Sequence, residues 1–238
     1  MSVSMAILGE NYSIVAADTR TTNFLNGNVD DDGEKIFRYK WGWVSESGGV
    51  SAATDLFKLL LTAYIYDTRK QIHNFWLKSI KGTIEAAEKC GVKGTDQEMN
   101  SSNAFVSINY FSDRPVLEID TMDFKYGRRV LNAKNSLIIN PPKQTKRIKR
   151  LIKKYSSLAT GDVHEAIYVM ACFLHGLAKT NKWVSSTLDC GISLQISDTE
   201  ILLMRLRQNA ELIKSVYEER GDLSEMMMVC EKAPNQDM

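Results

Sequence analysis

The sequence contains no apolar run that approaches the roughly 20 residues a helix needs to cross a bilayer, and its start lacks the basic region and long apolar core of a secretory signal. We therefore expect no membrane contact and a cytoplasmic protein. The net charge is only +1 over 238 residues, which gives no global attraction to nucleic acid or anionic membranes. Internal repeats and low-complexity linkers are also absent, which favours a single domain over 1–238, with about 221–238 as a loose C-terminal extension.

Little in the sequence suggests a metal or thiol site. The four cysteines, Cys90, Cys172, Cys190 and Cys230, form no CxxC pair. Scattered thiols of this kind predict neither a disulfide framework nor a zinc site, and we expect no metal and no organic cofactor. The three histidines fall in segments with helical periodicity, where surface positions are favoured over a His-Cys or Ser-His-Asp site.

The order of expected elements indicates the fold class. Two apolar segments, at 3–7 and 13–17, flank a Gly-Glu-Asn turn and predict a hairpin. Further strands are expected at 35–39, 41–45, 104–111, 116–120, 129–132, 136–139, 190–196 and 200–206, and helices at about 52–64, 75–89, 143–155, 163–179 and 209–220. Runs of strands and runs of helices favour the α+β class. We expect a four-layer αββα sandwich of two antiparallel sheets with helices on the outer faces.

Four positions near the amino terminus form a coherent candidate site. Removal of Met1 would leave Ser2 as a terminal serine, whose hydroxyl is a nucleophile and whose α-amine, with a pKa of about 8, is a base on the same residue. The hairpin brings Asp18 back to the level of Ser2. Lys35, on the following strand, would lower the pKa of the seryl hydroxyl and amine through its charge. Gly48 stands in a Gly-Gly junction before a helix, where a backbone N–H suits an oxyanion.

Each of these residues also has a plainer interpretation. Serine is common after an initiator methionine, Asp18 can cap a turn, Lys35 can be a surface lysine, and Gly48 can belong to an ordinary loop. Their order and spacing together favour the catalytic interpretation.

In these segments the sequence resembles the proteasome β-subunit superfamily of N-terminal-nucleophile (Ntn) hydrolases, which includes the bacterial heat-shock peptidase. The matching stretches are Ala-Asp-Thr-Arg at 17–20, Lys-Ile at 35–36, and 47–61, which runs from Ser-Gly-Gly through Ala-Ala-Thr-Asp into a leucine-rich helix. The match is specific over 2–61 and continues beyond as a match of element order. The resemblance implies the Ntn-hydrolase fold.

The resemblance also implies roles for individual residues. Ser2 corresponds to the nucleophile, Asp18 and Lys35 to its catalytic partners, and Gly48 to the glycine whose amide forms the oxyanion hole. Further positions at or beside the site are, by correspondence alone, Arg20 and the substrate-pocket residues Thr21, Thr22 and Val50.

Two family motifs are altered in this chain. Asn140-Pro141-Pro142 stands where the family has Gly-Ser-Gly, so no site residue is assigned there. The family's Asp-x-x-Ser-Gly-Gly corresponds to Ser-Thr-Leu-Asp-Cys-Gly at 186–191, in which Ser186 and Asp189 are candidate site neighbours.

The favoured function is hydrolysis of an amide or peptide bond by Ser2, as in a threonine/serine-type endopeptidase. The resemblance implies a homo-oligomer, built as a ring or from dimers, and leaves an ATPase partner open. One alternative is a small-molecule amidase or a peptide ligase on the same scaffold. Another is a non-catalytic ring or assembly subunit of a proteasome-like complex.

A basic stripe runs along the helix expected at 143–155. It carries seven lysines and arginines between residues 143 and 154, with apolar residues on the opposite face. No aromatic platform or glycine-rich phosphate loop accompanies it, so nucleic-acid binding is disfavoured. A solvated helix face is the plain interpretation, and docking to an acidic neighbouring subunit is the functional one.

Overall fold

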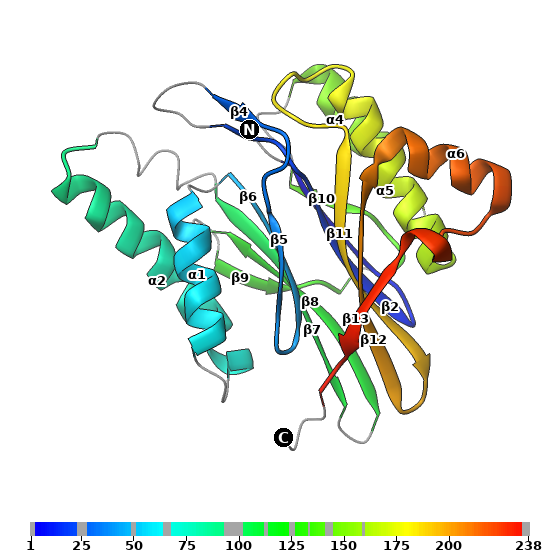
Figure 1. Cartoon of the computed structure of the whole chain (residues 1–238), viewed down its shortest axis with the longest axis horizontal. Helices are drawn as coiled ribbons and strands as arrows, with labels where there is room; N and C mark the ends of the chain where they lie inside the picture. Colours follow the sequence, from blue (N-terminus) through cyan, green and yellow to red (C-terminus); the bar gives the residue numbers. More distant parts are fainter. Residues whose placement is uncertain are drawn as a thin grey trace.

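The computed structural model of the chain describes residues 3–22, 28–48, 51–63, 68–92, 102–111, 114–123, 127–132, 134–140, 145–158 and 160–234. Two large antiparallel sheets lie in the middle of the molecule (Figure 1). The first has six strands in the order β10 (Ile138–Asn140), β1 (Ser4–Leu8), β2 (Tyr12–Asp18), β11 (Thr187–Ser197), β12 (Glu200–Asn209) and β13 (Met228–Lys232). The second has five in the order β5 (Ile36–Tyr39), β6 (Gly42–Ser47), β7 (Asn103–Phe111), β8 (Pro115–Asp123) and β9 (Gly127–Val130). A short ribbon pairs β3 (Thr21–Thr22) with β4 (Val29–Asp30).

Helices cover the outer faces of both sheets. The six-stranded sheet is covered by α4 (Lys146–Ser156), α5 (Val163–Ala178) and α6 (Ala210–Arg220), and the five-stranded sheet by α1 (Ser51–Ala63) and α2 (Thr68–Lys89) (Figure 1). A 3-10 turn, η1 (Ser224–Met226), precedes β13. None of the described helices is long and apolar enough to cross a membrane.

Three apolar cores join the two sheets and the two sets of helices, which form the four layers of the molecule. One lies between the six-stranded sheet and α4–α6, one between the five-stranded sheet and α1–α2, and one between the two sheets. Strands β1 and β2 are buried along their whole length, because each contacts apolar layers on both faces. The expected αββα sandwich is therefore confirmed.

Several boundaries differ from the sequence prediction. Helix α2 begins at Thr68 rather than at 75, and the last hairpin is longer, with β11 over Thr187–Ser197 and β12 over Glu200–Asn209. Within the expected C-terminal extension, Ser224–Met226 form the 3-10 turn η1 and Met228–Lys232 form β13, which pairs with β12. Every residue of β13 is exposed, so no alternation of buried side chains marks it in the sequence. Residues 112–113, between the strands expected at 104–111 and 116–120, Pro141-Pro142 and residues 235–238 lie outside the described residues.

Candidate active site

The amino-terminal hairpin closes as predicted. Ser4 of β1 lies opposite Ala17 of β2. One residue further out, the Asp18 N–H donates to the Val3 carbonyl at 3.3 Å, and the Val3 N–H donates to Asp18 Oδ1 at 2.9 Å. Ser2 itself lies outside the described residues, which begin at Val3. The residue bonded to Ser2 is thus held directly by Asp18.

The carboxylate of Asp18 is fully buried and surrounded by donors. Besides Val3, Lys35 Nζ donates to Oδ1 at 2.9 Å, and the backbone N–H groups of Arg20 and Ser185 donate to Oδ2 at 3.1 and 3.2 Å. Burying an ionised carboxylate is costly unless it is paired and hydrogen-bonded, and here both oxygens are satisfied. Asp18 therefore links the start of β1, the lysine and the segment before β11.

Lys35 lies just before β5 and is almost completely buried, with 8% of its surface exposed. Burial lowers the pKa of its ammonium group, and the neighbouring Asp18 carboxylate opposes this effect without cancelling it. A lysine whose pKa is lowered and whose one carboxylate partner is fixed is suited to tune the pKa of a nearby nucleophile.

Gly48 lies at the same end of the sandwich. It follows β6, which pairs with β5, and the Glu46 N–H donates to the Lys35 carbonyl at 3.1 Å. Gly48 has φ of 77°, a left-handed conformation that favours glycine, and its carbonyl accepts from Ser102 Oγ at 3.2 Å. Val50, predicted to line the substrate pocket, lies outside the described residues.

A serine pair ties the end of β6 to the start of β1. Ser4 Oγ and Ser47 Oγ are 2.9 Å apart, and both hydroxyls donate to Asn103 Oδ1, at 3.2 and 2.7 Å. Ser47 immediately precedes Gly48, so this bond holds the predicted oxyanion-hole residue near the amino-terminal strand. Nothing local in the sequence indicates the pair, because Asn103 is contributed by a distant strand.

Ser185 is a site residue that sequence reasoning missed. Its N–H donates to Asp18, and its hydroxyl accepts from the Thr19 N–H at 3.0 Å and lies 2.9 Å from Thr19 Oγ1. Ser186, a predicted candidate for a site neighbour, is exposed, and its hydroxyl accepts from Asn209 Nδ2 at 3.2 Å, at the start of α6. The motif comparison located this stretch with an error of one residue. In an extended chain, neighbouring side chains point in opposite directions, so this error selects the wrong side chain.

Asp189 is buried, but its partner is a different residue. It forms two hydrogen bonds with Arg205, at 2.9 Å to Nε and 2.7 Å to Nη2. In the β2–β11 register Asp189 lies opposite Ala17, whose side chain belongs to the layer between the two sheets. Residues paired across strands share a face, so Asp189 points into that layer.

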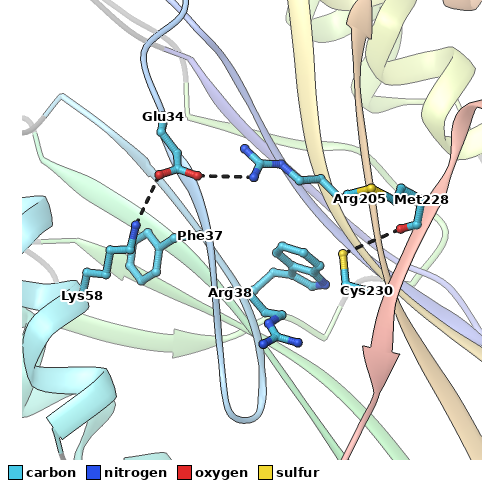
Figure 2. Close-up of a pocket in the computed structure, with 8 residues that line it drawn as sticks. Glu34, Phe37, Arg38, Lys58, Arg205, Met228 and Cys230 are labelled. Atoms are coloured by element: carbon cyan, nitrogen blue, oxygen red, sulfur yellow. Dashed lines mark hydrogen bonds and ion pairs between the residues drawn. The ribbon is translucent and has the colours of Figure 1, made fainter.

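Arg205 borders a cleft of about 400 Å³ next to the Asp18–Lys35 pair. Figure 2 shows Glu34 between Arg205 and Lys58, with ion pairs of 3.3 and 3.2 Å. Glu34 lines this cleft while the next residue, Lys35, bonds to Asp18. The cleft and the ion pair are therefore adjacent but separate features. The remaining lining residues are Phe37, Arg38, Trp43, Met228 and Cys230.

Arg20 and the two threonines predicted to line a substrate pocket, Thr21 and Thr22, follow Asp18 in the chain. The Arg20 guanidinium pairs with Asp31, so it braces the loop before Lys35. Thr21 and Thr22 form β3, and Thr22 Oγ1 is buried without a hydrogen-bond partner among the described residues. Within the same part of the chain, no group of three His, Cys, Asp or Glu side chains is placed to hold a metal ion.

The similarities to known proteins lie in structure rather than in sequence. No family model and no curated protein matches the chain. Among solved structures, the fold is similar to Anbu from Hyphomicrobium sp. strain MC1, a Gly-1 mutant, with a TM-score of 0.63 and 14% identity over 92% of this chain and 94% of that chain. It is similar to Anbu from Yersinia bercovieri, described as an ancestral β-subunit, with a TM-score of 0.64 and 14% identity over 91% of this chain and 93% of that chain. A helical assembly of the Anbu complex from Pseudomonas aeruginosa has a TM-score of 0.68 and 13% identity over 91% and 92%.

These similarities extend over nearly the whole chain. The protein thus has the four-layer sandwich of the proteasome-like Ntn-hydrolase fold, as the resemblance over 2–61 implies. At 13–14% identity the likeness shows the fold alone. Any statement about chemistry depends on the residues themselves.

Proposed function

We propose that the protein hydrolyses amide or peptide bonds with Ser2 as an N-terminal nucleophile, once Met1 has been removed. The observation that carries the proposal is the buried Asp18–Lys35 pair, whose carboxylate also holds the backbone of Val3. Burying a carboxylate and a lysine together costs desolvation energy that their attraction does not always repay. The presence of such a pair therefore supports a role for it in the site. This one is placed at the residue to which Ser2 is bonded.

In the proposed reaction, Ser2 Oγ attacks the carbonyl carbon of the amide while the α-amine of the same residue takes the hydroxyl proton, directly or through a water. The tetrahedral oxyanion accepts a hydrogen bond from the Gly48 N–H. The protonated α-amine then transfers its proton to the leaving amine, and the C–N bond breaks to leave an ester on Ser2. Water attacks that ester, again assisted by the α-amine, and restores the free hydroxyl.

Lys35 and Asp18 act on this reaction through charge and position. The ammonium of Lys35 lowers the pKa of the Ser2 hydroxyl and keeps the α-amine unprotonated near neutral pH. Asp18 holds Lys35 Nζ at 2.9 Å and therefore sets the direction from which this charge acts. Ser185 binds the Asp18 carboxylate through its N–H and Thr19 through its hydroxyl, and is a positioning residue.

We further propose that the protein assembles from copies of itself. The support is the fold, since the similar Anbu complex from Pseudomonas aeruginosa forms a helical assembly. A peptide or another amide is the substrate expected from the Ser2 chemistry.

Intact mass and an acyl-trapping probe test the Ser2 proposal together. We expect the purified chain to lack Met1 and a β-lactone to add one equivalent to Ser2. The Ser2→Ala variant should not be labelled, Ser2→Thr should keep labelling, and Ser215→Ala, which changes an exposed serine on α6, should label like the wild type. Quantitative retention of Met1, or labelling that persists in Ser2→Ala, contradicts the proposal.

The same measurements separate the alternatives. A chain that assembles but retains Met1 and takes no label is a non-catalytic assembly subunit. A labelled chain that cleaves small amides but not a peptide mixture is a small-molecule amidase. Capture of the acyl group by an added amine, in preference to water, indicates a peptide ligase.

A further inference from the structure

The helical layer over the six-stranded sheet carries an uneven charge. Helix α4 has six exposed basic residues and no acidic one: Lys146, Arg147, Lys149, Arg150, Lys153 and Lys154. These cations lie within about 16 Å, the length of an 11-residue helix. Because the chain as a whole has a net charge of +1, the residues outside α4 carry a net charge of −5.

The apolar side of α4 is already used, so the basic side faces outward. Ile148 is buried, and Leu151, Ile152 and Tyr155 pack against the same apolar layer. Among the described residues, no acidic side chain forms an ion pair with any of the six cations. Six like charges without local partners repel each other, and an external acidic surface would relieve that repulsion.

The same layer carries the opposite charge on the far side of α5. Helix α6 and the turn after it present five exposed acidic residues against two basic ones, Lys214 and Arg220; the acids are Glu211, Glu218, Glu219, Asp222 and Glu225. Arg220 serves two of these acids, Glu219 at 4.0 Å and Glu225 at 3.0 Å. A net negative charge therefore remains on this surface.

The two charged surfaces are held apart and presented to the outside. Helix α5 contacts both α4 and α6, and the three helices lie on one face of the sheet (Figure 1). Each surface also has one exposed leucine, Leu158 after α4 with 42% and Leu212 in α6 with 45% of its surface accessible. Each surface thus has an apolar contact to add to its charges.

We propose that α4 of one copy docks on α6 and residues 221–225 of a second copy. Every copy supplies both complementary surfaces, so the partner is always present at the concentration of the protein itself. A polyanion such as nucleic acid would also meet the net charge of −5 on the rest of the chain, which repels it. This contact gives the proposed self-assembly a defined surface, and it does not depend on Ser2 chemistry.

Charge reversal on each surface tests the contact. The first variant combines Lys149→Glu, Arg150→Glu and Lys153→Glu. A matched control places the same charge change on α2, at the exposed residues Lys78, Lys81 and Lys89. Sedimentation velocity over a concentration series at about 50 mM salt, where screening is weak, should show at least tenfold weaker association for the α4 variant and unchanged association for the control.

The second variant combines Glu211→Lys, Glu219→Lys and Glu225→Lys. It should also fail to associate with itself, yet it should associate with the α4 variant, because a basic α4 then meets an acidic α6. In the wild type, raising the salt to about 0.5 M should dissociate the complex, since the Debye length falls to a few ångströms.

Several results would overturn the contact. These are a wild type that stays monomeric at low salt, an α4 variant that associates normally, or a second variant that does not associate with the α4 variant. Binding of a single-stranded oligonucleotide that only the α4 variant loses, in a monomeric wild type, assigns α4 to a polyanion instead. Circular dichroism and urea midpoints confirm that each variant is folded. Probe labelling of Ser2 is read in the same samples, so failure of the contact and failure of the proposed catalysis are distinguishable.

Discussion

The buried carboxyl group of Glu46 allows a quantitative test of the structure. Glu46 lies on β6, two residues before Gly48, with only 9% of its surface exposed. Burial raises its pKa from 4.5 to about 7; a hydrogen bond from Thr54 opposes the shift, and the charge of Asp55 adds to it. Ionisation of Glu46 places an unpaired charge in the protein interior, which destabilises the folded state. We therefore predict that Glu46→Gln is more stable than the wild type at alkaline pH.

The magnitude follows from linkage between protonation and folding. The folded state binds the Glu46 proton more tightly than the unfolded state, so this contribution to stability is complete below pH 4.5 and is lost as pH rises through about 7. At roughly 1.4 kcal/mol for each pH unit, the loss amounts to about 3 kcal/mol. A glutamine cannot ionise and does not undergo this loss. The free energy of unfolding of Glu46→Gln, relative to the wild type, should therefore rise by about 3 kcal/mol between these pH values.

Urea unfolding across this pH range measures the difference directly. Other titrating groups are common to both proteins and cancel in the comparison. The control is Glu85→Gln, which makes the same substitution at an exposed position of α2. A difference for Glu46→Gln that is flat with pH, or that falls as pH rises, would refute the assignment of Glu46 as a buried, destabilised carboxylate.

Three further substitutions test the contacts around the site. Lys35→Met leaves the buried Asp18 without its cation and should lower the free energy of unfolding by about 3 kcal/mol or more, measured by urea titration, and it should abolish probe labelling. Ser185→Ala removes the hydroxyl that braces the chain beside Asp18 and should cost about 1–2 kcal/mol, with slower labelling that Ser185→Thr partly restores; unchanged stability and labelling would contradict a positioning role. Gly191→Ala places a Cβ within 2.4 Å of the Trp43 ring, and overpacking of this kind costs about 1–3 kcal/mol. We therefore expect a lower thermal midpoint. An unaltered midpoint would contradict the close packing of the two sheets at this point.

The site shows how far sequence reasoning reaches. The amino-terminal hairpin placed Asp18 beside the start of β1, whereas Lys35 was assigned to the same site by the resemblance over 2–61. Gly48 was named from its Gly-Gly junction before a helix and from the resemblance, and the structure adds that its backbone is left-handed, with φ of 77°. Ser185 could not be distinguished from its neighbour, since it lies just before β11 and meets Asp18 only through the path of that segment in the folded chain.

The sequence by itself determined the class of the fold and the amino-terminal hairpin, which depend on hydrophobic runs, turn residues and short-range spacing between residues close in the chain. Its resemblance over 2–61 predicted Asp18, Lys35 and Gly48 as members of one site. Only the tertiary structure decided that Asp189 pairs with Arg205, that Glu46 is buried under α1, and that residues 228–232 form an edge strand. Each of these depends on elements far apart in the sequence, where burial and charge are set by what the folded chain brings together.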